Sequence, residues 1–201
     1  MRTVTVTGHG ESRVVPDSAV VRVAAVHRAA GVAEALAGAD SAAKQIVATA
    51  REHTTPDRIG TTSVHIWQAH DNTGAPSGFD ARHSLTVRCD DIDAAGALLS
   101  ALAESVGDRL QLENVSVEVA DRGPAETAAR EAAYADAVER ATRLATLAGS
   151  SLGDPQEVVE GGAVSIVGQP RTAKAVAMAD VGLEPGELSV TSSVTVTFQL
   201  R

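Results

Sequence analysis

Three histidines are the side chains in this chain with the most obvious potential for chemistry. His65, His70 and His83 lie on or beside a predicted hairpin, and imidazole is a common ligand of zinc. A zinc site needs three or four converging ligands, however, and the sequence contains no His-x-His or His-Glu-x-x-His pattern to supply them. We therefore expect no metal and no cofactor. The alternative is that the region around these three histidines binds a metal or a small ligand, or acts as a hydrolase.

Other potentially reactive residues have simpler structural explanations. Cys89 is the single cysteine, so no disulfide forms within the chain, and in the strand-like run Leu85–Cys89 its thiol is expected to pack as a small hydrophobe. Gly8-His9-Gly10 lacks the spacing of a phosphate-binding loop and precedes a strand, so we interpret it as a turn that ends a strand over 3–7. No serine lies in a Gly-x-Ser-x-Gly elbow. We expect the protein not to be an enzyme.

Bulk composition excludes several classes of partner. The chain has 201 residues, is 44% hydrophobic and has a formal net charge of −9, with its basic residues scattered. Nucleic-acid binding relies on clustered Lys and Arg and is not expected. No apolar stretch is long enough to predict a membrane span. The N-terminus alternates polar and apolar residues without a signal-peptide core, which predicts a cytoplasmic protein, or a periplasmic or secreted one if a leader has been removed.

The elements that must position these residues alternate between strand and helix periodicity. The predicted order is β-β-α-β-β-α-β-α-β-β, which favours an α+β fold of mostly antiparallel sheet with helices on one face. Pro124 near the start and Gly149 just past the end bound the longest helix. The predicted strands are 3–7, 19–26, 59–69, 79–89, 110–119, 157–160 and 188–200, and the predicted helices are 32–52, 91–106 and 124–148.

We expect a single domain over 1–201. Within it, we interpret 1–89 and 110–201 as two sub-halves joined by the helix 91–106. The stretches 19–89 and 110–200 each follow a β-α-β-β order, which suggests a duplication. Residues 161–187 have no clear period. A segment of that length without regular structure is predicted to be functional, ordered by a partner, or disordered, and it could gate a small-ligand site.

Several motifs resemble one known family along nearly the whole chain. Thr5–Glu11 followed by Val15-Pro16-Asp17 resembles the opening of SIMPL (YggE-like) domains, and Asp57–Thr62 looks like their segment after the first helix. Ala129–Gly153 is similar to their Ala-rich helix and Leu-Gly exit, and Pro185-Gly186-Glu187 to their closing motif. The residues matched to structural motifs are Gly8, Gly10, Pro16, Asp17, Gly149, Gly153, Pro185 and Gly186.

The resemblance implies a role in assembly or signalling. Members are linked to oxidative-stress tolerance in bacteria, to a kinase-associated adaptor in animals, and to periplasmic immunogens that form ring-like assemblies. No catalytic residues are established for the family, so none are transferred here. We expect two departures from the family, namely no leader and few aromatic residues around the central hairpin, where only Trp67 and Phe79 occur.

Self-association is the function that the residue pattern favours. Strands 3–7 and 188–200 are rich in Val and Thr and carry few charges, so they are expected either to pair with each other or to form subunit contacts. The Ala-rich helix offers a second surface that permits close approach. We therefore expect a soluble homo-oligomer, a non-enzymatic scaffold or adaptor with a link to stress, whose protein partners the sequence does not identify.

Overall fold

The structure is a computed structural model that describes residues 2–161, 165–168 and 182–201. The described chain divides into two compact units, and each has its own antiparallel sheet. Unit 1 holds the described residues of 2–16, 121–168 and 186–201, and unit 2 holds 17–120 with 182–185. The predicted α+β class with antiparallel sheet is confirmed.

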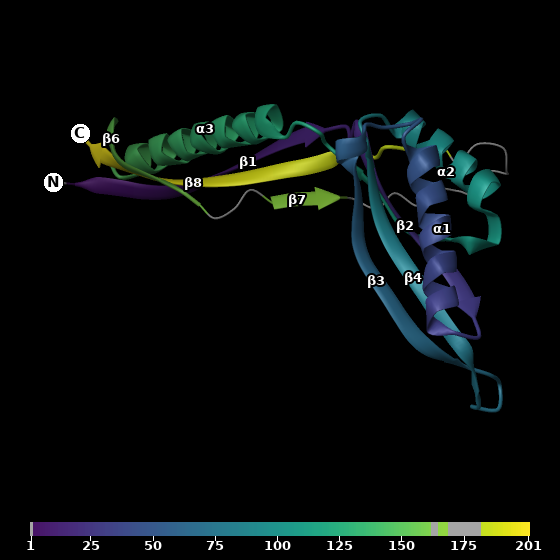
Figure 1. The fold of residues 1–201 in the computed structure, drawn as a ribbon. Helices are drawn as coiled ribbons and strands as arrows, with labels where there is room; N and C mark the ends of the chain where they lie inside the picture. The colour runs from purple at the N-terminus through teal and green to yellow at the C-terminus, as the bar shows by residue number, and fades with distance from the viewer. Residues whose placement is uncertain (1, 162–164, 169–181) are drawn as a thin grey trace. The chain divides into compact units, whose positions relative to one another are not determined.

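Unit 1 brings the two ends of the chain together in one sheet. Its strand order is β1-β8-β6, with β7 also pairing with β8, and α3 lies along β1 and β8 (Figure 1). Of the two alternatives for the first and last strands, the structure shows that they pair with each other, from Thr3 opposite Gln199 to Val14 opposite Leu188. The elements are β1 (Thr3–Val14), α3 (Gly123–Leu147), β6 (Leu152–Glu160), β7 (Ser165–Gly168) and β8 (Leu188–Leu200).

Helix α3 packs on this sheet through alanines that recur every fourth residue. Its buried residues are Ala125, Ala129, Ala133, Ala137, Ala141 and Ala145. A row of residues spaced by four forms a continuous ridge inclined to the helix axis, and methyl groups make that ridge low. The helix therefore approaches the sheet closely, over a core that includes Val6, Val194, Val196 and Phe198.

Unit 2 contains the other sheet, with α1 packed on β2 and β4 and α2 packed on α1. The strand order is β3-β4-β2-β5, and the predicted hairpin is the pair β3–β4. Asp91 caps α2, because its side chain accepts a hydrogen bond from the Asp93 N–H. The elements are β2 (Ser18–Ala29), α1 (Val32–Ala50), η1 (Pro56–Arg58), β3 (Ile59–His70), β4 (Pro76–Cys89), α2 (Ile92–Val106), η2 (Gly107–Arg109) and β5 (Leu110–Glu118).

The core of unit 2 is aliphatic, as the composition predicts. Alternate residues of β2 and β4 face the helices, which contribute Ile46, Leu98 and Leu102. The sheet contributes Val21, Val23, Leu85 and Val87 to the same cluster. None of the helices among the described residues combines the length and apolarity that a membrane crossing requires.

One local prediction is wrong: Gly8-His9-Gly10 is not a turn. Strand β1 runs without interruption from Thr3 to Val14, and both glycines pair with β8. The sequence pattern suggested a break because glycine disfavours a strand in isolation. Here the glycines stay in the strand because the backbone of α3 lies directly over them.

The division into units also differs from the sub-halves read from the sequence. The first strand belongs with the last one, so the boundary falls after Pro16 and not near residue 89, and the helix α2 lies inside unit 2. Within the segment 161–187, Ser165–Gly168 forms β7 and pairs with β8. Residues 162–164 and 169–181, on which the prediction of a gate depends, lie outside the described residues.

Candidate functional site

The contact between β1 and α3 depends on the absence of side chains at two positions of the strand. A Cβ atom on Gly8 would lie 2.1 Å from the carbonyl oxygen of Ala133, and one on Gly10 would lie 2.1 Å from that of Ala129. These neighbours are backbone atoms, which cannot rotate away. The Gly-x-Gly motif is therefore a close-packing site for the helix, and no space remains beside it for a phosphate group.

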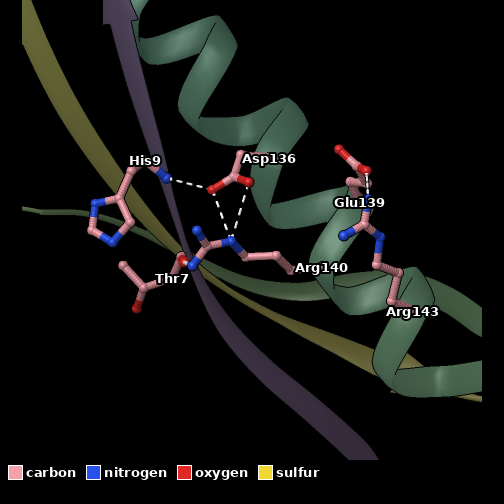
Figure 2. A network of polar contacts seen from close by, with 6 residues as sticks. All are labelled: Thr7, His9, Asp136, Glu139, Arg140 and Arg143. Atoms are coloured by element: carbon pink, nitrogen blue, oxygen red, sulfur yellow. Dashed lines mark hydrogen bonds and ion pairs between the residues drawn. The ribbon is translucent and has the colours of Figure 1, made fainter. Parts of the chain in front are cut away.

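Two side chains of α3 bind the free edge of β1 at this point (Figure 2). Asp136 Oδ2 accepts a hydrogen bond from the His9 N–H at 2.8 Å, and Arg140 Nη1 donates one to the Thr7 carbonyl at 3.1 Å. Arg140 Nε also binds the Asp136 carboxylate, at 3.0 Å from Oδ2. We call these two residues the edge cap. They occupy backbone groups with which an added strand would pair.

The two side chains of the edge cap, Asp136 and Arg140, form an ion pair. The hydrogen bond from the His9 backbone, followed by those from Arg140, holds the pKa of Asp136 below its usual value, so the carboxylate stays ionised near neutral pH. One turn along the helix, Arg143 pairs with Glu139 (Figure 2). A hollow of about 410 Å³ beside β1 is lined by both arginines, but each already has its carboxylate partner.

The structure does not bring the three predicted histidines together. The register of the β3–β4 hairpin sets His83 opposite Val64 and His65 opposite Arg82. Neighbouring residues of a strand point to opposite faces, so the side chains of His65 and His83 lie on opposite sides of the sheet, and His65 shares its face with Trp67 as expected. His70 lies at the end of β3. The described residues contain no cluster of three or more His, Cys, Asp or Glu suited to a metal ion.

His83 lines a hollow in unit 2. Its Nε2 lies 2.9 Å from Thr61 Oγ1, beneath α1, where a cavity of about 310 Å³ opens. Cys89, by contrast, is 1% exposed, and burial raises the pKa of its thiol, as do Asp90 and Asp91 beyond it. A thiol in this state is a poor nucleophile and a poor oxidation sensor.

The remaining motif residues have structural roles. Asp17 begins the connection into β2, where its Oδ1 accepts from the Ala120 N–H at 2.8 Å and its own N–H donates to the Glu118 carbonyl at 3.1 Å. Gly149 ends α3 with a positive φ of 65°, as the sequence predicted for a helix terminus. Gly153 packs against Gln199 of β8.

The sequence alone did not predict the edge cap, although the spacing of its two residues is a feature that the sequence contains. Asp136 and Arg140 have the i, i+4 spacing of a helical ion pair. Similar spacing relates Glu126 to Arg130 and Glu139 to Arg143 on the same helix, so spacing alone does not single out the pair that contacts β1.

Comparison with known proteins identifies the family of this chain. The family described as SIMPL, a protein of unknown function (DUF541), matches residues 4–198. No curated protein matches. Solved structures with local similarity include a de novo designed protein, Foldit4 (13% identity, 51% of this chain and 99% of that chain, TM-score 0.30). Another is an unknown protein from Galdieria sulphuraria (13% identity, 89% and 81%, TM-score 0.24).

A third similar structure is a hydantoinase/carbamoylase family amidase from Burkholderia ambifaria, at 19% identity over 61% of this chain and 34% of that chain, with a TM-score of 0.27. These similarities are too low to support an argument about function. The family match, by contrast, extends over almost the whole chain and agrees with the motifs at both of its ends. The chain belongs to the SIMPL family.

Proposed function

We propose that this chain is a non-enzymatic scaffold that associates with copies of itself through the free edge of β3. The observation that carries the proposal is the character of this strand. Strand β3 lies at the end of the unit 2 sheet, spans Ile59–His70, and contains no Asp, Glu, Lys, Arg or Pro. A long, uncharged edge strand favours pairing with a strand of another molecule.

The side chains of β3 add to this tendency. Val64 and Trp67 are each 46% exposed and lie within the regular stretch Ser63–Gln68, between the two register shifts of the strand. Bulges discourage pairing at the positions where they occur, and these two leave the middle of the strand regular. Two copies pairing antiparallel through Ser63–Gln68 would bring no like charges together.

The other edges of the two sheets have features that discourage pairing. The middle of β1 is occupied by the edge cap. Strand β5 carries Glu113 and Glu118, and β6 carries Pro155 among three acidic residues. Charged residues and proline are the usual means by which natural proteins protect a sheet edge. Among the edge strands whose side chains the structure describes, β3 is the one without such protection.

A link to oxidative stress, which the family resemblance implies, does not run through the thiol of Cys89 in this proposal. That side chain is buried and its raised pKa keeps it protonated. A scaffold could contribute to stress tolerance by holding other proteins, and its own assembly would then be the property to measure.

Light scattering at several protein concentrations tests the proposal. We expect the wild-type mass to rise with concentration above 20.5 kDa, the mass of one chain. Val64→Lys with Trp67→Lys places charges on the edge of β3 and is expected to return the mass to that of one chain. Leu112→Lys, at a residue 52% exposed on the opposite edge strand β5, is the matched control and should assemble as the wild type does.

Two results would contradict the proposal. If the wild-type mass equals that of one chain at every concentration, the protein does not self-associate. Assembly that survives the β3 substitutions but is lost in Leu112→Lys would place the contact on β5. Circular dichroism of each variant checks that the fold is retained.

A further inference from the structure

A hollow in unit 2 lies between α1 and the β3–β4 hairpin, with a volume of about 310 Å³. Ligand pockets in proteins begin at about this size. Helix α1 contributes Lys44 and Val47, Arg51 directly follows the helix, and the sheet contributes Thr61, His83 and Leu85. The hollow lies on the face of the sheet that α1 covers, whereas the proposed self-association uses the backbone edge of β3 over Ser63–Gln68.

The walls combine an apolar floor with a charged rim. Leu85 is buried at the base and Val47 is half-buried beside it, so a short hydrocarbon group would find apolar contacts there. Arg51 directly follows the end of α1 and comes seven residues after Lys44, which places the two cations on the same side of the helix about two turns apart. A ligand with an apolar body and a charged head matches this arrangement.

The charge at the rim is positive and only partly neutralised. Lys44 Nζ pairs with Asp40 at 2.7 Å, whereas the Arg51 guanidinium makes no hydrogen bond or ion pair with the residues that the structure describes. In the same part of the chain, Arg28 and Arg82 both bind carboxylates. An arginine free of such a partner keeps its five donors available for an anion.

A hydroxyl and an imidazole that are bonded to each other complete the lining. Thr61 Oγ1 and His83 Nε2 lie 2.9 Å apart, and a hydroxyl and an imidazole bonded to each other keep one further donor or acceptor each. They offer a hydrogen bond to the head of a ligand without adding negative charge. Asp40 is the acidic group near His83, and it is already paired with Lys44.

We propose that this hollow binds a small organic anion, with a carboxylate or phosphate head held by Arg51 and Lys44 and a short aliphatic body against Leu85 and Val47. Charge-assisted hydrogen bonds to a guanidinium are among the strongest polar contacts available to such a head. The protein as a whole carries a net charge of −9, so binding of an anion requires local cations of this kind.

Arg51 also has a structural explanation that the experiment must separate from binding. It follows the last residue of α1, where a cation interacts favourably with the helix terminus. On that explanation alone, replacing Arg51 would lower the stability of the protein but leave ligand binding unchanged.

NMR titration of the full chain, followed at the His83 ring and Leu85 methyl resonances, tests the proposal. The probes are hexanoate, inorganic phosphate and hexan-1-ol. We expect hexanoate to shift these resonances saturably with a Kd on the order of 1 mM. Hexan-1-ol, which has the same hydrocarbon body without the charge, is expected to cause no saturable shift. Saturation by phosphate but not by hexanoate would assign the head as a phosphate.

Charge-removing variants locate the site. Arg51→Gln and Lys44→Gln should each weaken hexanoate binding about tenfold, the effect of losing one charge-assisted hydrogen bond. Arg88→Gln removes the same charge from the opposite face of β4 and should bind as the wild type does. The proposal is overturned if neither anion causes saturable shifts, if hexan-1-ol binds equally well, or if Arg51→Gln reduces stability alone.

Discussion

At the level of single residues, the carboxylate of Asp136 connects helix α3 to the backbone of β1. It accepts the N–H of His9 and holds Arg140, which in turn binds the carbonyl of Thr7. One ion pair thereby satisfies two backbone groups of an edge strand. Both side chains are also available to solvent, so the effect depends on their ionisation and can be tested by pH.

We expect the stability of the protein to depend on pH through Asp136. Its pKa is lowered in the folded protein, chiefly by the His9 hydrogen bond, from an unfolded value of about 3.9. The stabilisation is therefore present above about pH 4 and is lost as the pH falls through the lower, folded pKa. Urea unfolding of the wild type and of Asp136→Asn across this range measures it. The difference in unfolding free energy should be largest near neutral pH.

Glu139→Gln provides the matched control for that measurement, because Glu139 pairs with Arg143 and, within the part of the chain that the structure describes, makes no hydrogen bond to β1. It should change the pH dependence less than Asp136→Asn does. Equal curves for the wild type and Asp136→Asn at all pH values would mean that the edge cap contributes nothing to stability.

At Gly8 and Gly10 the backbone of β1 lies directly against the backbone of α3, and this contact is the main result at the level of elements. The glycines of β1 and the alanines spaced by four on α3 together allow the strand and the helix to approach closely. Neither feature predicts this contact alone. A glycine in a strand and an alanine in a helix are both common, and their meaning comes from their contact.

Gly8→Ala is expected to be strongly destabilising, because the new Cβ would lie 2.1 Å from the Ala133 carbonyl and 2.4 Å from the Ala137 nitrogen. Overpacking of this kind costs roughly 1–3 kcal/mol of unfolding free energy, or more where backbone must move. Urea unfolding measures it. Gly60→Ala is the control, since a Cβ there meets nothing within 4 Å, and it should change stability by less than about 1 kcal/mol. Similar values for both variants would contradict the packing argument.

The two units draw on the sequence in different ways: unit 1 combines both ends of the chain, whereas most of unit 2 comes from the single stretch 17–120. Unit 1 needs both ends of the sequence, because β8 is the strand that pairs with β1, β6 and β7. Unit 2, in contrast, has its complete sheet and both of its helices within 17–120. The two units should therefore respond differently when the chain is divided.

We expect the fragment 17–120 to fold by itself. It retains the cluster of buried residues around Ile46, Leu85 and Leu98, and loses from that cluster only the partly buried Leu183. Thermal unfolding of the fragment followed by circular dichroism should show a cooperative transition. The fragment 121–201, which lacks β1, should show none. A non-cooperative 17–120 fragment would mean that unit 2 depends on the rest of the chain.

Most elements of this fold follow from local pattern. Alternation predicts the strand 188–200 with its observed bounds, and helical periodicity predicts α1 and α2 to within two residues at each end. Caps and terminators such as Asp91 and Gly149 act through their own backbone neighbours. Interactions between residues a few positions apart depend only on the local sequence, so a single sequence is sufficient to predict them.

Features that join distant segments could not be found in this way. Continuation of β1 through Gly8 and Gly10 depends on a helix more than a hundred residues later, and so does the edge cap. The side of the sheet on which His83 lies depends on the register of β3 and β4, and its pairing with Thr61 beneath α1 depends on how that helix packs. Each of these local sequence patterns is compatible with several structures. Contacts between distant segments determine which structure forms, and those contacts exist only in the folded chain.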